Sequence, residues 1–157
     1  MSSMNDSIRI RPMTAEDVER VIEVAESLKL APQWKRGAYL TALNSEAALR
    51  RIALAADDST TGVVGFAVAS LTPPESELET IGIIAEFQRR GVARRLFDEV
   101  TKALRLAQVQ TIGLEVRASN EAARAFYDSL GFAESSRRPR YYADPVEDAV
   151  LMCLKIN

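Results

Sequence analysis

The sequence has 157 residues, no histidine and a single cysteine. Without histidine, a histidine general base, Ser–His and Cys–His triads, and histidine-ligated metals are excluded. With Cys153 alone, an internal disulfide and a zinc site built from a cysteine cluster are excluded as well. We therefore expect no metal, and any chemistry must rest on carboxylates, phenols and backbone groups.

Long hydrophobic runs and a strong net charge are also missing. No apolar run approaches the ~18 residues that a membrane span needs, and the polar segment 1–7 lacks the hydrophobic region of a secretion signal. We expect no membrane partner and a cytoplasmic location. The formal net charge of −2 argues against nucleic acid as the main partner. With 47% hydrophobic and 27% charged residues, the chain is expected to fold as one globular domain, residues 1–157.

What is present is an alternation of strand and helix patterns. Helices are predicted after the capping sequence 14–17, over 38–49, over 92–107, and from Ser119 or Asn120 to Gly131. Strand patterns cover residues 8–11, 51–56, 63–71, 78–84, 111–117, 132–142 and 148–156. This order predicts an α/β fold with a mixed sheet.

The most informative segment is 88–95, Gln-Arg-Arg-Gly-Val-Ala-Arg-Arg, between a predicted strand and a predicted helix. Arginines at a helix N-terminus are unfavourable, because that end already carries partial positive charge and unpaired N–H groups. An anion would remove the conflict, and Gly91 and Ala93 leave the backbone accessible to one. The segment predicts a diphosphate-binding turn, with a solvated basic cap as the alternative. It is neither a P-loop nor the glycine-rich dinucleotide-binding motif.

Four residues in the C-terminal half are examined for chemistry. Glu115 lies on the opposite face of its strand from Leu114, and is either an exposed or ion-paired glutamate or a partly buried general base. Asn120 is a helix N-cap, a role compatible with binding a ligand. Tyr127 is either a core aromatic or a phenol that donates a proton. Cys153 lies in an alternating apolar strand and is expected to be a small buried hydrophobe rather than a nucleophile.

Two sets of motifs resemble a known family. The turn 88–93 is similar to the Q/R-x-x-G-x-G/A signature of the GCN5-related N-acetyltransferases (GNATs). The stretches 114–123 (Leu-Glu-Val-Arg-Ala-Ser-Asn-Glu-Ala-Ala) and 126–132 (Phe-Tyr-Asp-Ser-Leu-Gly-Phe) resemble the RimI-type ribosomal-protein-alanine N-acetyltransferases. So do Arg-Pro-Arg-Tyr-Tyr (138–142) and Glu-Asp-Ala (147–149). The resemblance is nearly continuous from Ile81 to the C-terminus and loose in the N-terminal third.

The resemblance implies the GNAT fold, a mixed and mostly antiparallel sheet of about seven strands with about four helices. It also implies acetyl-CoA as co-substrate, Glu115 as the proton acceptor and Tyr127 as the proton donor. The acetyl-CoA contacts that it implies are Ile81, Gly82, Ile83, Arg89, Arg90, Gly91, Val92, Ala93, Arg94 and Asn120. Two departures stand out: Arg140 occupies the place where the family usually has Asn, and Ile84-Ala85-Glu86 replaces the usual Asp-Pro before the turn.

These residues suit acetyl transfer on chemical grounds. An acetyl thioester is already activated, so neither a metal nor a protein nucleophile is required. An α-amino group has a pKa of about 8, against about 10.4 for lysine, so a glutamate can remove its proton at neutral pH. A backbone N–H near Ile83 can stabilise charge on the carbonyl oxygen. We expect direct transfer in a ternary complex, with Glu79 on the neighbouring strand as the next carboxylate to test if Glu115 is not the base.

The acceptor is predicted from side chains around this chemistry. Trp34, Tyr141 and Tyr142 are candidate substrate-binding residues, and Asp144, Glu147 and Asp148 add negative charge that would attract an ammonium group. The leading hypothesis is a protein N-terminus, with a ribosomal small-subunit protein beginning in alanine as the candidate that the resemblance implies. The alternatives are a small amine, such as a polyamine or an antibiotic, and an acetyl-CoA-binding module without activity. Retention of both Glu115 and Tyr127 argues against the last.

Overall fold

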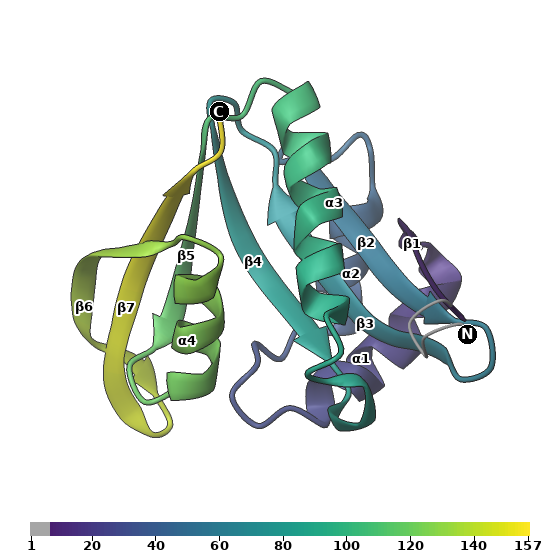
Figure 1. Cartoon of the computed structure of the whole chain (residues 1–157), viewed down its shortest axis with the longest axis horizontal. Helices are drawn as coiled ribbons and strands as arrows, with labels where there is room; N and C mark the ends of the chain where they lie inside the picture. The colour runs from purple at the N-terminus through teal and green to yellow at the C-terminus, as the bar shows by residue number, and fades with distance from the viewer. Residues whose placement is uncertain (1–6) are drawn as a thin grey trace.

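A seven-stranded sheet with helices on both faces forms the molecule in the computed structural model, which describes residues 7–157 (Figure 1). The strands are β1 (Ile8–Pro12), β2 (Arg51–Asp58), β3 (Gly62–Ser70), β4 (Glu75–Ile83), β5 (Thr111–Arg117), β6 (Ala133–Ala143) and β7 (Val146–Lys155). The helices are α1 (Val18–Glu26), α2 (Arg36–Leu43), α3 (Val92–Leu106) and α4 (Glu121–Ser129), with short 3₁₀ turns at Ala15–Asp17 and Ala85–Phe87. The predicted α/β fold is confirmed.

The strand order is β1-β2-β3-β4-β5-β7-β6, and every neighbouring pair is antiparallel except β4 and β5. Those two strands pair in parallel over three residues only, Glu75–Glu77 with Thr111–Gly113. Beyond that short seam their ribbons diverge (Figure 1). The sheet is therefore two halves, β1–β4 and β5–β7–β6, joined at one end and open at the other.

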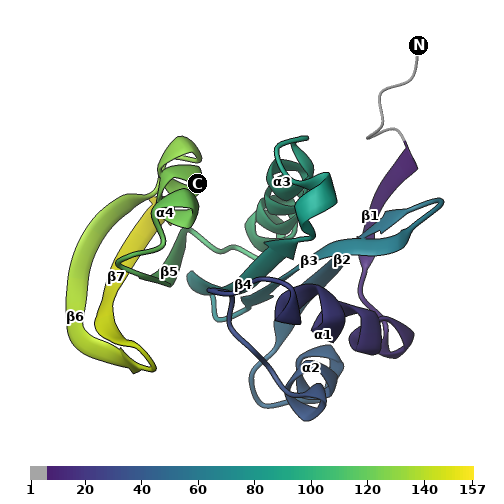
Figure 2. The ribbon, with the colours of Figure 1, turned by 90° about the horizontal axis from the view of Figure 1, so that it is seen from below.

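The helices divide between the two faces of the sheet. α3 and α4 lie on one face, and α1 and α2 lie on the other, beneath the β1–β4 half only (Figure 2). α3 presents a buried stripe to the sheet, as its sequence pattern predicts, made of Val92, Leu96, Val100 and Leu104. None of the helices in residues 7–157 combines the length and apolar character that crossing a membrane requires.

Local signals fix the ends of two helices. At the start of α1, the Thr14 N–H donates to Asp17 Oδ2 at 2.8 Å, which confirms the predicted capping. At the end of α4, Gly131 has φ +102° and donates its N–H to the Asp128 carbonyl, and the Phe132 N–H donates to the Tyr127 carbonyl. This pair of bonds is a Schellman motif, and Phe132 packs back into the core as predicted.

Several predicted boundaries were wrong. α2 ends at Leu43 rather than near residue 49, because the Asn44 side chain accepts the Glu46 N–H and stabilises a turn instead. β4 begins at Glu75, three residues before the predicted start of this strand at residue 78. Cys153 is exposed rather than buried, because it lies on the opposite face of β7 from its buried neighbour Met152.

Candidate active site

The divergence of β4 and β5 leaves backbone groups along β4 without a strand partner. The Ile84 N–H donates to the Val64 carbonyl at 2.9 Å, which sets the hydrogen-bonding pattern with β3. Because hydrogen-bonded and non-bonded pairs alternate in an antiparallel ladder, Gly82 bonds to Phe66 while Ile81 and Ile83 point their backbone groups toward β5. The predicted donor at Ile83 therefore faces the opening, whereas the backbone of Gly82 is engaged with β3.

The predicted diphosphate turn stands at the N-terminus of α3. Gly91 is the N-cap residue with φ +81°, and a Cβ there would meet no heavy atom within 4 Å. Among the described residues, the N–H groups of Val92, Ala93 and Arg94 have no hydrogen-bond acceptor, and the first turn of α3 contains no acidic residue. Bare donors, open space and excess positive charge together fit an anion such as a diphosphate.

The arginines of this turn divide into distinct environments. Arg89 is exposed and has φ +62°, and Arg90 stacks over the Phe87 ring with 4.9 Å between guanidinium carbon and ring centroid. Arg94 reaches α4, where its Nη2 lies 3.4 Å from Ser129 Oγ. Arg95 points the other way and donates to the Ile8 carbonyl of β1. Arg95 therefore connects α3 to β1, whereas Arg94 extends toward α4 and Arg89 is exposed to solvent.

α4 and its N-cap contribute the predicted Tyr127 and Asn120. Asn120 is the N-cap, and its Oδ1 accepts the Ala123 N–H at 3.2 Å, so its side-chain NH₂ stays available. Tyr127 is half-buried, between the rings of Phe126 at 5.6 Å and Phe132 at 5.7 Å. Burial, with a smaller contribution from Tyr142, raises the pKa of Tyr127 to about 12. Its phenol is protonated at neutral pH, as a proton donor must be.

Glu115 lies on the face of β5 away from α4. Its carboxylate forms an ion pair with Arg138 of β6 at 3.3 Å, and 20% of its side chain is exposed. Tyr141 also contacts it: the pKa of Tyr141 is raised because its hydroxyl bonds to the Glu115 carboxylate. The structure thus brings the predicted base, Glu115, into contact with the predicted substrate-binding residue Tyr141. It also brings Arg138, a residue for which the sequence predicted no role, to Glu115.

Tyr142 packs on different neighbours from Tyr141. The guanidinium of Arg117 lies 4.3 Å from the Tyr142 ring centroid, and the same arginine pairs with Glu147 at 3.2 Å. Glu147 also accepts the Ser119 N–H, and these bonds lower its pKa. Two of the three acidic residues expected to attract an ammonium group are therefore already engaged: Glu147 holds the loop before α4, and Asp148 accepts the Arg140 N–H.

Trp34 lies apart from these tyrosines, in the loop between α1 and α2. Its ring packs against Tyr39 with centroids 5.2 Å apart. It lines a cavity of about 340 Å³ with Ala38, Thr41 and Arg51, and Arg51 pairs with Glu79 of β4 at 2.8 Å. Trp34 is thus linked to the acidic face of β4 through Arg51, and no described contact brings it to Glu115.

A third carboxylate, Glu77, had no role in the prediction from sequence. The register between β3 and β4 pairs Val68 with Thr80 and Ala69 with Leu78, so Glu79 forms a bulge. Alternation along β4 continues through the bulge and places Glu77 and Glu79 on one face, which Glu115 of β5 shares. The alternation Glu75, Glu77, Glu79 was visible in the sequence, but only the parallel seam shows that these residues approach β5.

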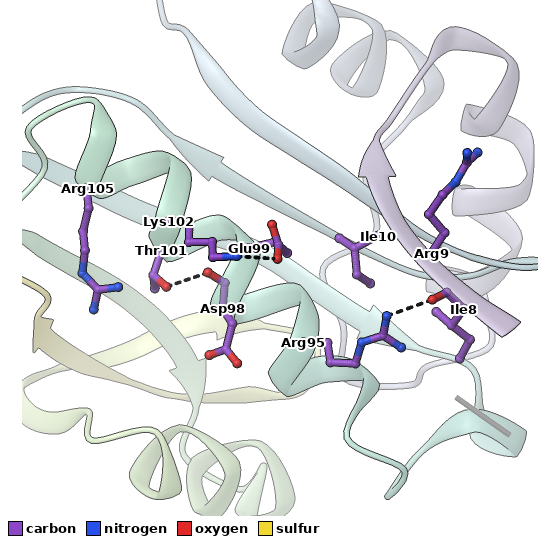
Figure 3. Close-up of a pocket in the computed structure, with 9 residues that line it drawn as sticks. All are labelled: Ile8, Arg9, Ile10, Arg95, Asp98, Glu99, Thr101, Lys102 and Arg105. Atoms are coloured by element: carbon purple, nitrogen blue, oxygen red, sulfur yellow. Dashed lines mark hydrogen bonds and ion pairs between the residues drawn. The ribbon is translucent and has the colours of Figure 1, made fainter. Parts of the chain in front are cut away.

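A larger depression of about 760 Å³ lies elsewhere, between β1 and α3 (Figure 3). Three of its charged side chains bond to each other or to the backbone: Lys102 pairs with Glu99, and Arg105 donates to the Ile156 carbonyl. It holds none of the predicted site residues.

Comparison with known proteins agrees with this geometry. The Acetyltransferase (GNAT) family matches residues 18–132, most of the chain. The chain belongs to the GNAT family. It is an N-acetyltransferase by this membership, and its relatives are RimI-like. It is 42% identical to the [Ribosomal protein bS18]-alanine N-acetyltransferase of Salmonella typhimurium over 106 residues, 66% of this chain and 70% of that protein.

Two further relatives extend the GNAT match over nearly the whole chain. The N-alpha-acetyltransferase RimI of Mycobacterium tuberculosis is 32% identical over 154 residues, 97% of this chain and 95% of that protein. The crystal structure of the ribosomal-protein-S18-alanine N-acetyltransferase from Escherichia coli superimposes with a TM-score of 0.82 at 28% identity, covering 96% of this chain and 94% of that one. The expected GNAT fold is confirmed.

Proposed function

We propose that this enzyme transfers an acetyl group from acetyl-CoA to the N-terminal α-amino group of a protein. The first candidate acceptor is a ribosomal small-subunit protein that begins with alanine, because relatives with this activity match the chain. One geometric relation supports the proposal: the turn at the N-terminus of α3, which we assign to the diphosphate, lies on the α3–α4 face of the sheet, and Glu115 lies on the opposite face of β5, near the short β4–β5 seam.

The residues present fit acetyl-CoA. The free N–H groups of the first turn of α3, with Arg89, Arg90 and Arg94, would hold its diphosphate, and Gly91 and Ala93 leave room for it. The rest of acetyl-CoA would contact the backbone groups of Ile81 and Ile83 and the side-chain amide of Asn120. Gly82, between the two isoleucines, has no side chain. Acetyl-CoA supplies the acetyl group already activated as a thioester.

Two side chains of the enzyme, Glu115 and Tyr127, then accept and donate the protons of the reaction. Glu115 takes a proton from the ammonium group of the acceptor, which leaves a neutral nitrogen able to attack. Tyr127, protonated because its pKa is about 12, donates its proton to the departing sulfur. The nitrogen of the new amide still carries one surplus proton, which returns to the Tyr127 oxygen and restores the phenol. The Ile83 N–H, which faces the opening, is the donor that we assign to the carbonyl oxygen. No covalent enzyme intermediate is needed, and Tyr141, Tyr142 and Trp34 are the candidates to contact the acceptor.

The test is a panel of N-terminal peptides and small amines, assayed for release of free CoA. Peptides beginning with alanine should be acetylated, and Glu115→Gln should lower kcat/KM most near neutral pH, where almost all of the amine is protonated. Above about pH 9 the free amine dominates, and the variant should recover part of its deficit relative to wild type at the same pH. A preference for polyamines would move the acceptor to small molecules, and a loss independent of pH would make Glu115 a positioning residue.

A further inference from the structure

We propose that the enzyme selects acceptors with an acidic side chain at the second or third residue, and that Arg138 and Arg140 of β6 bind this carboxylate. The inference rests on the proposed function and deepens it, because it assigns the charge of the acceptor beyond its α-amino group. Neither arginine has a part in the acetyl transfer argued above.

The guanidinium of Arg138 lies beside the proposed base. Its Nη1 is 3.3 Å from Glu115 Oε1, and its carbon is 5.5 Å from the ring centroid of Tyr141, whose hydroxyl bonds to the Glu115 carboxylate. The side chain of Arg138 is 55% exposed, so a ligand can reach it. Consecutive Cα atoms are about 3.8 Å apart. An acceptor whose α-amino group binds Glu115 therefore has its next side chains within reach of Arg138.

Binding of the acceptor takes away the counter-ion of Arg138. Before binding, the negative charge of Glu115 neutralises this arginine. The ammonium group of the acceptor first shares that charge and then removes it, because its proton moves to the Glu115 carboxylate. Arg138 keeps its positive charge throughout. A carboxylate on the acceptor would restore the lost partner through a charge-assisted hydrogen bond, so that one ion pair is exchanged for another.

Arg140 adds a second positive charge one residue before Tyr141. Within residues 7–157 its guanidinium has neither an ion pair nor a hydrogen bond, and the residue is exposed on the edge strand of the sheet (Figure 2). Its φ of +53° is uncommon for arginine, and Asp148 Oδ1 stabilises this conformation by accepting the Arg140 N–H at 3.0 Å. The chain therefore holds a cation here that none of the described groups neutralises.

The charges around the acceptor are thus separated by strand. Carboxylates project from β4 and β5, where the ammonium group binds, whereas β6 presents Arg138 and Arg140. Arg137 differs from both, since it pairs with Glu134 at 3.2 Å and projects to the opposite face of β6 from Arg138. An acceptor with a positive amino group followed by a carboxylate matches this arrangement, and one with lysine in the same place is repelled.

The experiment uses three alanine-initiated peptides that carry glutamate, glutamine or lysine at both the second and the third residue. Wild type should have a kcat/KM roughly fivefold higher for the glutamate peptide than for the glutamine peptide, and lowest for the lysine peptide. The preference should lie in KM and should shrink as NaCl is raised, because salt screens exposed charges.

Three variants then assign the preference to residues. Arg138→Gln and Arg140→Asn should each move the glutamate-to-glutamine ratio of kcat/KM toward one. Asparagine is used at 140 because it tolerates a positive φ. Arg137→Gln is the matched control, since it removes the same charge from the other face, and it should leave the ratio unchanged. The ratio is measured within each variant, so that any effect of Arg138 on Glu115 itself cancels.

The outcomes separate this inference from the function on which it rests. If wild type acetylates none of the three peptides or any other N-terminal peptide, the proposed function fails. If wild type acetylates the glutamine and glutamate peptides equally, or prefers lysine, only the acidic preference fails. A ratio that falls equally in all three variants would overturn the assignment to Arg138 and Arg140, because it would reflect the overall charge of β6.

Discussion

The glutamates of this protein differ in which groups neutralise their charge, and this difference indicates which of them have a structural role and which can take part in the reaction. Glu147 is bonded to Arg117 and Ser119 and fixes the loop before α4. Glu79 forms an ion pair with Arg51, and Glu115 forms one with Arg138 of the exposed strand β6. The tyrosines differ in the same way: Tyr127 and Tyr39 have raised pKa values because they are buried, but only Tyr127 lies on the helix that flanks the opening. The surroundings of a side chain, rather than its residue type, therefore distinguish residues proposed to act in the reaction from residues that only stabilise the fold.

Tyr127→Phe tests the proton donor. The substitution keeps the ring contacts with Phe126 and Phe132 and removes only the hydroxyl. We expect kcat to fall roughly 10²-fold, with acetyl-CoA affinity nearly intact, in steady-state assays and calorimetry. A parallel loss of thermal stability and activity would instead assign Tyr127 to the core.

Tyr39→Phe tests a buried hydroxyl away from the chemistry. Tyr39 is fully buried, and its OH has no hydrogen-bond partner among the described residues. Phenylalanine should raise the free energy of unfolding by about 1 kcal/mol, measured by urea unfolding at pH 7. Since burial raises the folded pKa to about 12, above about 10 when unfolded, the wild type loses stability as pH rises through this range, and the variant should lose less. A destabilised variant would mean that the hydroxyl has a partner, such as buried water.

At the scale of elements, the sequence predicted best where a signal is local. The limits of β5, the start of α3 and the Schellman end of α4 follow from alternation, Gly91 and Gly131 respectively. The prediction for Cys153 failed because alternation separates the two faces of β7 without saying whether a helix covers each one. The bulge at Glu79 was equally invisible, since it depends on how β3 pairs with β4.

Gly91→Val tests the turn before α3, and Gly62→Val is its matched control. Both glycines have positive φ, +81° and +87°, and at neither would a Cβ meet a heavy atom within 4 Å. Both variants should therefore lose about 1–2 kcal/mol of stability from backbone strain. Only Gly91→Val should also lose acetyl-CoA affinity, because its side chain enters the space that we assign to the diphosphate. Unchanged binding by calorimetry would show that the diphosphate site is elsewhere.

At the scale of the whole molecule, side chains distant in sequence complete the site. The sequence therefore predicted individual site residues but not the ion pairs that they form. Arg138 reaches Glu115 because β6 and β7 fold back beside β5. Arg51 reaches Glu79 across two strand pairings. Motifs identified Glu115 and Tyr127, whereas the ion pairs of Glu79 and Glu115 depend on the assembled sheet.

Stability toward acid depends on a different ion pair, between Arg11 and Asp17, which are close in sequence. Asp17 accepts two hydrogen bonds from Arg11, at 2.7 and 2.8 Å, and these bonds lower its pKa. A lowered folded pKa adds stability above the unfolded value of about 3.9 that is lost as pH falls through the folded value. Asp17→Asn should cost about 2 kcal/mol at pH 7 and flatten the fall in stability below about pH 4, followed by urea unfolding. Asp98→Asn, on the exposed side of α3, should change neither; a steep acid limb in Asp17→Asn would contradict this assignment.

The three-residue seam between β4 and β5 also has a kinetic consequence. β4 and β5 pair over three residues only, α3 and α4 lie on one face of the sheet, and Glu115 projects from the opposite face of β5. Two reactants can then arrive from opposite sides, in either order, and each product can depart without crossing the path of the other. A whole folded protein can remain outside, threading only its first few residues inward. Initial-rate patterns should therefore intersect when both substrates are varied, as for random-order sequential addition.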